Sequence, residues 1–179
     1  MKIPFLLSVP LLVAPLIVAQ SQKVPQSQAG AGLTHLQKEV RHELVMLPNI
    51  NIFDNLAFRV DGNTVTLMGQ VTEPVKKSDA ENVVKHIEGV GQVDNQIEVL
   101  PLSPNDDQIR RATYLTLVRQ PQLQRYFMQA VPPIRIIVKN GNVSLEGVVA
   151  NKVDSDFAKI TANGVPGVFS VTDSLRVEK

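Results

Sequence analysis

The apolar residues of the chain recur with two different periods, and the change from one period to the other marks the predicted elements. Between residues 33 and 47 the apolar positions lie three or four apart and predict a helix, which Pro48 limits. Two short stretches with strand alternation follow, Ala57–Val60 and Thr64–Val71. They predict a β-hairpin, because the intervening Asp61-Gly62 suits a two-residue turn in which Gly accepts a positive φ.

A second helix and a third strand complete this unit. Ala80 and Val84 lie on one side of the predicted helix, Pro74 suits its first turn, and Gly89 is expected to end it as the C′ residue. The segment Gln92–Leu100 predicts a third strand. The unit is therefore helix–strand–strand–helix–strand. It predicts an α+β fold, a three-stranded sheet with two helices on one face.

The same unit is present twice. When the chain is shifted by 78 residues, positions 58–99 align with 136–177 without a gap, and 11 of these 42 positions are identical. Upstream of this stretch the shift is 73, so the second copy contains five additional residues between Leu123 and Ile134. A self-match of this length predicts a duplicated domain, with copies at 33–100 and 103–178. The connection between the copies is short, which predicts that they are in contact.

Equivalent positions of the second copy repeat the structural signals. Its hairpin turn is predicted at Asn140-Gly141. Asn151 is expected to cap its second helix, and Asp154 suits the first turn. Gly167 is expected to end that helix, and Phe169–Val177 is the predicted third strand.

The N-terminus predicts export. Lys2 precedes an apolar stretch of about 15 residues, and a polar run follows it. This pattern is typical of a signal peptide, which we place at residues 1–21, followed by a flexible linker at 22–32 that is rich in Gln, Ser, Ala and Gly. The alternative is a membrane-spanning helix. It is disfavoured because roughly 20 apolar residues are needed to span a bilayer and because prolines lie within the stretch.

Composition excludes several classes of site. The 179 residues contain 18 Lys and Arg against 17 Asp and Glu, and they contain no Cys. Without Cys, a disulfide scaffold, a thiolate nucleophile, a zinc–thiolate site and lipid attachment at a cysteine are impossible. The near-zero net charge is not typical of a nucleic-acid-binding protein. The sequence has no Gly-x-Ser-x-Gly elbow and no Gly-x4-Gly-Lys-Ser/Thr phosphate loop, and we predict no enzymatic activity and no cofactor.

The repeated pattern resembles the BON (bacterial osmotic-stress and nodulation) domain. The first copy has Asp61-Gly62-x-x-Val65-x-Leu67-x-Gly69-x-Val71, then Ala80, then Gly89-Val90-x-x-Val93. The second copy has Gly141-x-Val143-x-Leu145-x-Gly147-x-Val149, then Ala158, then Gly167-Val168-x-x-Val171. The glycines expected to hold structural positions are Gly62, Gly69, Gly89, Gly141, Gly147 and Gly167.

The resemblance implies a role in the bacterial envelope, often with binding of anionic phospholipid, and no enzymatic activity. Tandem BON domains occur in osmotically inducible periplasmic proteins and in an outer-membrane lipoprotein tied to envelope integrity. This chain lacks the acylated Cys of the lipoprotein and the LysM module of the cytoplasmic BON proteins that bind potassium. With the predicted signal peptide, the resemblance predicts a periplasmic protein without a lipid anchor.

Charge is divided unevenly between the copies. Residues 33–100 contain six Lys and Arg against ten Asp and Glu, a net charge of −4, and residues 101–179 contain ten against seven, a net charge of +3. The second copy is expected to face an anionic partner, because each basic residue near an anionic membrane contributes about 1 kcal/mol to binding. The predicted lipid-binding residues are Arg110, Arg111, Tyr114, Arg119, Arg125, Tyr126 and Phe127.

The segment 119–133 carries the sharpest of these signals. Arg125, Tyr126, Phe127 and Met128 form a basic, aromatic and apolar cluster, typical of a contact at the membrane interface. A structural role is the alternative, and it is favoured for Phe127 and Met128 because short apolar loops usually pack. The two roles can coexist.

One further cluster of the sequence could bind a metal ion. His35, Glu39 and His42 share one side of the first helix at a spacing that metal ligands use, but such histidines are ordinary on a solvated face and we predict no metal site.

The sequence supports two hypotheses about function. The preferred function is a non-enzymatic periplasmic protein that associates with anionic phospholipid surfaces through its second copy. The alternative is a stress-related periplasmic module that binds envelope proteins or acts as a chaperone.

Overall fold

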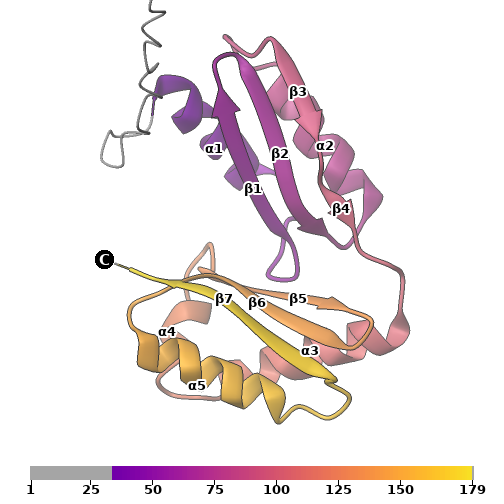
Figure 1. Ribbon diagram of the computed structural model, residues 1–179, viewed down its shortest axis with the longest axis vertical. Helices are drawn as coiled ribbons and strands as arrows, with labels where there is room; N and C mark the ends of the chain where they lie inside the picture. Colours follow the sequence, from indigo (N-terminus) through magenta and orange to yellow (C-terminus); the bar gives the residue numbers. More distant parts are fainter. Residues whose placement is uncertain (1–33, 179) are drawn as a thin grey trace, which may run out of the picture. The chain divides into compact units, whose positions relative to one another are not determined.

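A computed structural model describes residues 34–178, and the predicted signal peptide and linker lie outside the described residues. The first copy begins with α1 (His35–Met46), followed by β1 (Asn55–Asp61) and β2 (Thr64–Val71). After α2 (Pro74–Lys85) come two short strands, β3 (Gln92–Asn95) and β4 (Glu98–Val99). The order helix–strand–strand–helix–strand is as predicted (Figure 1).

The sheet of the first copy has the order β1-β2-β3, with β4 also paired to β2. β1 and β2 are antiparallel, whereas β3 and β4 run parallel to β2 in one register. The predicted single strand over 92–100 is thus interrupted at Gln96-Ile97, where the amide of Ile97 donates to the Asn95 side chain. The helices cover one face, and the buried core consists of Val40, Leu44, Leu47, Val65, Leu67, Val71, Ala80, Val84 and Ile97.

The second copy has the same topology with one additional helix. Its elements are α3 (Pro104–Val118), α4 (Gln124–Phe127), β5 (Ile134–Lys139), β6 (Asn142–Val149), α5 (Lys152–Asn163) and β7 (Ser170–Val177). The sheet order is β5-β6-β7, with β5 antiparallel and β7 parallel to β6. The single turn of α4 lies in the stretch that holds the five additional residues. The predicted α+β class with two helix-covered sheets is confirmed.

Side-chain caps explain where the helices begin. Thr34 accepts a hydrogen bond from the amide of Gln37, whose side chain accepts one in return from the amide of Thr34, a reciprocal capping box. Asn151 caps α5 by accepting from the amide of Asp154, as predicted. Ser103 caps α3 in the same way. Each cap satisfies one of the N–H groups that the first turn of a helix leaves without a partner.

Two local predictions are wrong by a few residues. Asp61 pairs with Thr64, so the first hairpin turns at Gly62-Asn63, one residue later than expected. The second hairpin does turn at Asn140-Gly141, where both residues have positive φ. The helices α2 and α5 end before Gly89 and Gly167, because tight i to i−3 hydrogen bonds close their last turns at His86 and Gly164.

One glycine in each sheet is required by the close approach of another backbone segment. Gly69 and Gly147 have φ of 111° and 122°, in a region that side chains rarely adopt. A Cβ on Gly69 would lie 2.0 Å from the carbonyl oxygen of Asn55, and one on Gly147 would lie 1.9 Å from that of Pro133. The matching glycines of the repeat therefore have a steric cause.

The predicted contact between the copies is confirmed. The loop before β1 contributes the carbonyl oxygen of Ile52, which accepts a hydrogen bond of 2.9 Å from the amide of Ile136 on β5. Phe53 in the same loop packs against the core of the second copy. Lys139 and Glu98 form an ion pair of 2.5 Å.

Candidate functional site

Three of the residues predicted to bind lipid are buried. Arg110, Tyr126 and Phe127 are exposed by only 4%, 5% and 9%. Arg110 lies against the sheet, where its guanidinium donates a hydrogen bond of 2.8 Å to the carbonyl oxygen of Val138 and pairs with Asp107. Direct contact of these three side chains with a membrane is therefore inconsistent with the fold, and we correct the prediction for them.

Tyr126 and Arg125 belong to a polar corner at the start of α5. The hydroxyl of Tyr126 donates to the carboxylate of Asp154 and accepts a hydrogen bond of 2.9 Å from the amide of Ala150. Arg125 also pairs with Asp154. The hydrogen bond from Tyr126, together with those from Arg125 and Asn151, holds the pKa of Asp154 below its ordinary value. The same pairing raises the pKa of Arg125. Arg125 thus already has a carboxylate partner.

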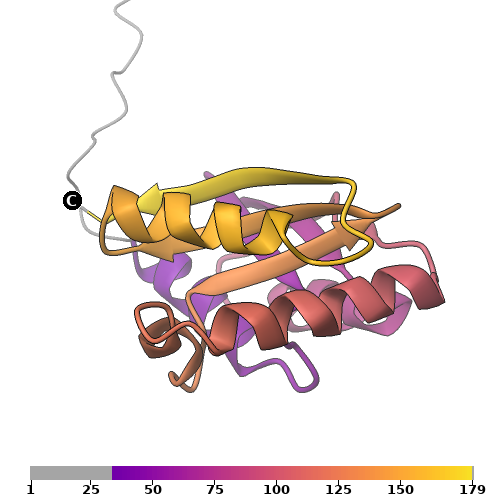
Figure 2. The same cartoon turned by 90° about the horizontal axis from the view of Figure 1, so that it is seen from below.

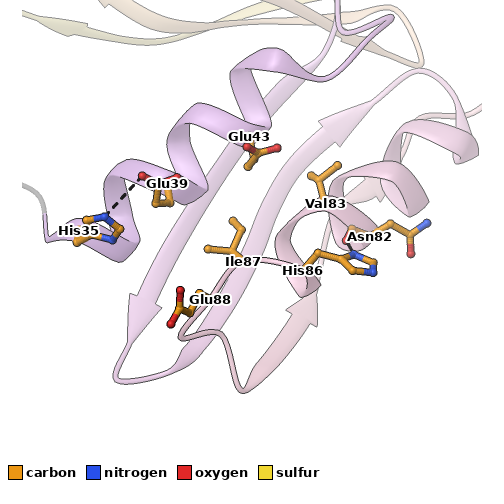
Figure 3. Close-up of a pocket in the computed structure, with 8 residues that line it drawn as sticks. All are labelled: His35, Glu39, Glu43, Asn82, Val83, His86, Ile87 and Glu88. Carbon is orange, nitrogen blue, oxygen red and sulfur yellow. Dashed lines mark hydrogen bonds and ion pairs between the residues drawn. The ribbon is translucent and has the colours of Figure 1, made fainter.

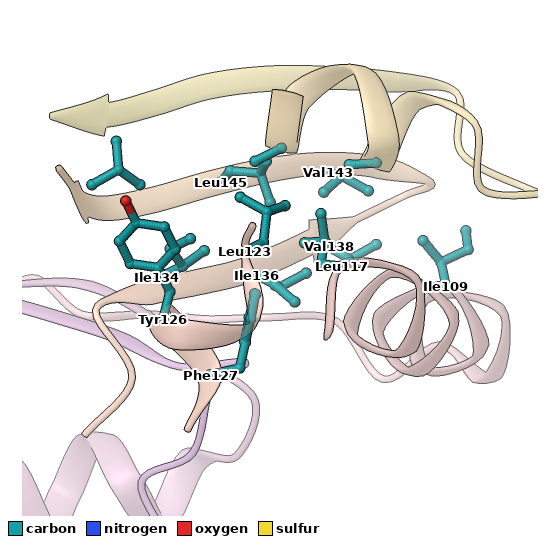
Figure 4. Packing of buried hydrophobic residues seen from close by; sticks show 13 residues of the cluster. Ile109, Leu117, Leu123, Tyr126, Phe127, Ile134, Ile136, Val138, Val143 and Leu145 are labelled. Atoms are coloured by element: carbon teal, nitrogen blue, oxygen red, sulfur yellow. The ribbon is translucent and has the colours of Figure 1, made fainter. Parts of the chain in front are cut away.

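Phe127 has the structural role that the sequence favoured. Its ring meets that of Tyr114 edge to face, with centroids 5.8 Å apart, and Tyr114 meets Phe53 in the same way at 6.4 Å. Figure 4 shows Phe127 and Tyr126 among the aliphatic side chains beneath the sheet. Met128 differs from Phe127, because it is 76% exposed.

The remaining predicted residues lie on the outer surface of α3. Arg111 and Arg119 are exposed, and Leu115 between them is 47% exposed. These three residues are spaced four apart, so they form one stripe along the helix. Neither arginine forms an ion pair within residues 34–178. Of the predicted set, Arg111 and Arg119 are therefore the cations free to meet an anionic partner.

Sequence reasoning missed exposed apolar side chains elsewhere in the second copy. Ile160 on α5 is 70% exposed, and Phe169, just before β7, is 84% exposed. Phe169 points to the helix-covered side, because side chains alternate along a strand and Val171 and Leu175 pack in the core. Lys159 beside Ile160 is exposed and forms no ion pair within the described residues.

We call this set the helix-layer surface of the second copy: Arg111, Leu115, Arg119, Lys159, Ile160 and Phe169. α3 and α5 lie on the same side of the sheet and in contact with each other (Figures 1 and 2). A comparison of the two copies would have revealed the apolar members. In the first copy the positions of Leu115, Ile160 and Phe169 hold His42, Asn82 and Gly91.

The histidines of α1 do not form a metal site. His35 Nε2 lies 3.8 Å from Glu39 Oε1, while His42 borders a different hollow with Lys38 and Arg41. Within residues 34–178 no group of three or more His, Asp and Glu side chains is placed to hold a metal ion. None of the helices in this part of the chain is long and apolar enough to span a bilayer.

Comparison with known families is consistent with this architecture. Residues 33–101 and 105–179 each match the BON domain. The chain belongs to the BON domain family. Osmotically-inducible protein Y of Escherichia coli (strain K12) is 26% identical to it over 164 residues, which cover 88% of this chain and 80% of that protein.

Two solved structures of CdsD, a structural protein of the type III secretion system of Chlamydia trachomatis, were also matched. They cover 83% and 80% of this BON protein, and 100% and 93% of their own chains, at 12% and 13% identity. Both have a TM-score of 0.29, which is too low to imply a common arrangement.

Proposed function

We propose that this tandem BON protein is a non-catalytic, stress-related protein of the bacterial envelope that binds anionic phospholipid surfaces through its second copy. The observation that carries the proposal is the helix-layer surface, which combines exposed apolar side chains with exposed cations that form no ion pair within residues 34–178. The resemblance to an osmotically inducible protein supports the link to stress. The predicted signal peptide supports a periplasmic location.

The chemistry of this surface suits the boundary between lipid headgroups and acyl chains. Arg111, Arg119 and Lys159 each supply about 1 kcal/mol of attraction to an anionic leaflet. Side chains such as Ile160 and Phe169 gain free energy when they leave water for the acyl region. Together, the electrostatic and apolar contributions predict a weak, reversible contact with the membrane. Salt weakens this contact, because exposed charges are screened over about 10 Å at 0.1 M salt.

Co-sedimentation with vesicles tests the proposal. The protein is mixed with phosphatidylcholine vesicles that contain increasing fractions of phosphatidylglycerol, at low and at high salt. We expect the bound fraction to rise with phosphatidylglycerol and to fall with salt. Equal binding to pure phosphatidylcholine would show that anionic headgroups are not recognised.

Charge reversal on α3 locates the contact. R111E/R119E is expected to weaken binding to anionic vesicles by about 30-fold or more, because at least two contributions of about 1 kcal/mol are lost. The matched control is R59E/R176E, which changes the net charge equally. Arg59 and Arg176 lie on the faces of the sheets opposite the helices, since the flanking residues Phe58, Val60 and Leu175 pack in the cores. Equal losses in both variants would indicate a net-charge effect instead.

The apolar part of the surface is tested separately. L115S/I160S/F169S keeps every charge and removes the exposed apolar side chains, so we expect binding to fall at all salt concentrations. The buried residues Tyr126 and Phe127 are unsuitable for such a test, because their replacement would disturb the core of the second copy.

A second candidate function is a contact with other envelope proteins, including unfolded ones. Exposed apolar side chains favour it, since Leu102, Phe169 and Ile160 are 93%, 84% and 70% exposed. This function predicts that the protein slows the aggregation of an unfolded outer-membrane protein and that L102S/I160S/F169S does not. Unchanged aggregation at a large molar excess of the protein would exclude it.

A further inference from the structure

A groove between α1 and α2 of the first copy has a lining that the equivalent helix positions of the second copy do not repeat. It has a volume of about 700 Å³ and is lined by His35, Glu39, Glu43, Asn82, Val83, His86, Ile87 and Glu88. Figure 3 shows the glutamates around its rim and Ile87 and Val83 between the helices. Val83 and Ile87 are partly buried against the core, so the floor is apolar and the rim is acidic.

The carboxylates of this groove are available to a partner. Within the described residues 34–178, Glu43 and Glu88 form no ion pair, and Glu39 contacts only His35 at 3.8 Å. No Lys or Arg is among the lining residues. On α3 the positions equivalent to His35, Glu39 and Glu43 hold the uncharged Gln108, Ala112 and Thr116. The acidic rim is therefore not required by the fold.

The outer stripe of α3 is complementary to this groove in charge and in polarity. It places Arg111 and Arg119 on either side of Leu115, at a spacing of four residues. The stripe spans eight residues, or about 12 Å at the helical rise. On α1 the two glutamates Glu39 and Glu43 are about one helical turn apart, and Glu88 follows α2. Leu115 falls midway between the arginines, as the apolar floor falls between the acidic residues.

We propose that the α3 stripe of one chain docks in the α1–α2 groove of a second copy of this chain. Arg111 and Arg119 meet the glutamates of the groove, and Leu115 covers Val83 and Ile87. The contact joins two different surfaces, so it is heterologous. A linear series of copies then has one free groove at one end and one free stripe at the other, and it can grow further. The stripe is also part of the surface proposed above to bind membranes, and self-association competes with membrane binding.

Sedimentation velocity of the purified protein without lipid tests the contact. At low salt the weight-average sedimentation coefficient is expected to rise steadily with protein concentration, and high salt is expected to return the protein to a monomer. E39K/E43K and R111E/R119E should each weaken self-association by at least about tenfold, since they reverse two charges on one side of the contact. Wild-type protein that remains monomeric at high concentration and low salt would overturn the proposal.

A mixture of the two variants gives the decisive result. E39K/E43K retains a native stripe and R111E/R119E retains a native groove, and the two reversed surfaces are again opposite in charge, so the mixture should regain the association that each variant alone has lost. The matched control is D61K/D94K, which makes the same change in charge on the opposite face of the first sheet and should associate like wild type. A mixture that stays monomeric, or a control that loses association like E39K/E43K, would overturn the assigned contact.

These outcomes separate the inference from the proposed function. The sedimentation experiment contains no lipid, and E39K/E43K leaves the helix-layer surface intact. Loss of self-association with retained binding to phosphatidylglycerol vesicles is therefore expected for E39K/E43K. If a basic peptide saturates the groove while the wild-type protein remains monomeric, the partner is a different protein and self-association is excluded.

Discussion

Lys76 in the first copy and Asp154 in the second occupy the same position, the third residue of the helix that follows the hairpin, and both are buried. Lys76 Nζ lies 2.9 Å from Asp54, whose carboxylate also accepts the amide of Thr72 at 2.8 Å. In the second copy, Tyr126 binds Asp154 and accepts the amide of Ala150, the equivalent of Thr72.

We call the buried polar cluster at the start of α2, like the one at the start of α5, the corner of its copy. The comparison shows which part of the corner the fold requires. In both copies the segment before the first strand provides an oxygen that accepts the backbone amide just after the second strand. A buried amide without a partner costs about 1 to 3 kcal/mol, so this acceptor is needed. The sign of the charge at the helix position is not needed, because the loop supplies an acid in one copy and Tyr126 with Arg125 in the other.

The largest expected effect comes from breaking the corner of the first copy. K76A leaves the carboxylate of Asp54 buried without its cation, which is expected to lower the free energy of unfolding by about 3 to 5 kcal/mol. Urea unfolding followed by circular dichroism measures the loss. D54N/K76M removes both charges and should recover part of it. A K76A protein as stable as wild type would mean that water reaches the Asp54 carboxylate and compensates for the missing ammonium.

Replacing the glycine that a neighbouring backbone segment approaches should lower the stability of both copies by a similar amount. G69A and G147A each place a Cβ about 2 Å from a carbonyl oxygen at a positive φ. Backbone strain and overpacking together predict a loss of about 2 to 4 kcal/mol for each variant. Both tyrosines, Tyr114 and Tyr126, lie in the second copy, so tyrosine fluorescence follows that copy and far-ultraviolet circular dichroism follows both. A tolerated alanine at either site would show that the strand can shift away from it.

Removing the Tyr126 hydroxyl of the second copy should cause a smaller loss of stability, and this loss should depend on pH. Y126F removes the hydroxyl that binds Asp154 and Ala150, which is expected to cost about 1 to 3 kcal/mol at neutral pH. The pKa of Asp154 is lowered in the folded protein, first by Tyr126. Its contribution is therefore fully present above its ordinary value of 3.8 and is lost as the pH falls through the lower folded value.

Urea unfolding of Y126F at neutral pH and at several values below pH 3.8 tests this linkage. The difference in stability between wild type and Y126F should narrow as the solution becomes more acidic. Y114F is the matched control, since the hydroxyl of Tyr114 has no hydrogen bond to Asp154. A difference that stays constant across the titration would assign the stabilisation to packing alone.

The smallest effect concerns the helix caps beside the two corners. Asn151 caps α5 through its side chain, whereas Glu73 at the start of α2 makes no such hydrogen bond. N151A is expected to cost about 1 kcal/mol. E73A removes no cap; it does remove an ion pair of 3.1 Å with Lys76, but Glu73 is exposed and Lys76 keeps Asp54 as a partner, so the loss should be only about 0.5 kcal/mol. Equal effects in thermal unfolding would show that the side-chain cap adds nothing at Asn151.

The outer surfaces of the copies differ as much as their buried corners. The first copy has an acidic groove between its helices, and the second has cations with exposed apolar residues on the same layer. Duplication supplies the same two-helix layer twice, and substitution on its solvent side changes the surface chemistry without disturbing the core. This division is the physical basis of both proposals.

The sequence by itself determined the unit, its duplication and most of the elements. Helical and strand periods report local geometry, and Asn151 and Asn140-Gly141 act within a few residues of their own positions, so these predictions held. The predicted helix ends at Gly89 and Gly167 failed because the last turn of each helix tightens three residues earlier. The sequence does not encode such an alternative hydrogen bond as a separate signal.

Only the tertiary structure decided which charged and aromatic residues face water. Arg110 is buried because β5 packs beside α3 and offers the carbonyl of Val138, a residue 28 positions away. Tyr126 is buried because Asp154 and Ala150 come together from distant parts of the chain to bind its hydroxyl. Exposure depends on such long-range contacts, and local periodicity carries no information about them. The candidate lipid-binding surface is therefore assigned to the outer side of α3 and α5, and no longer centres on the 119–133 segment.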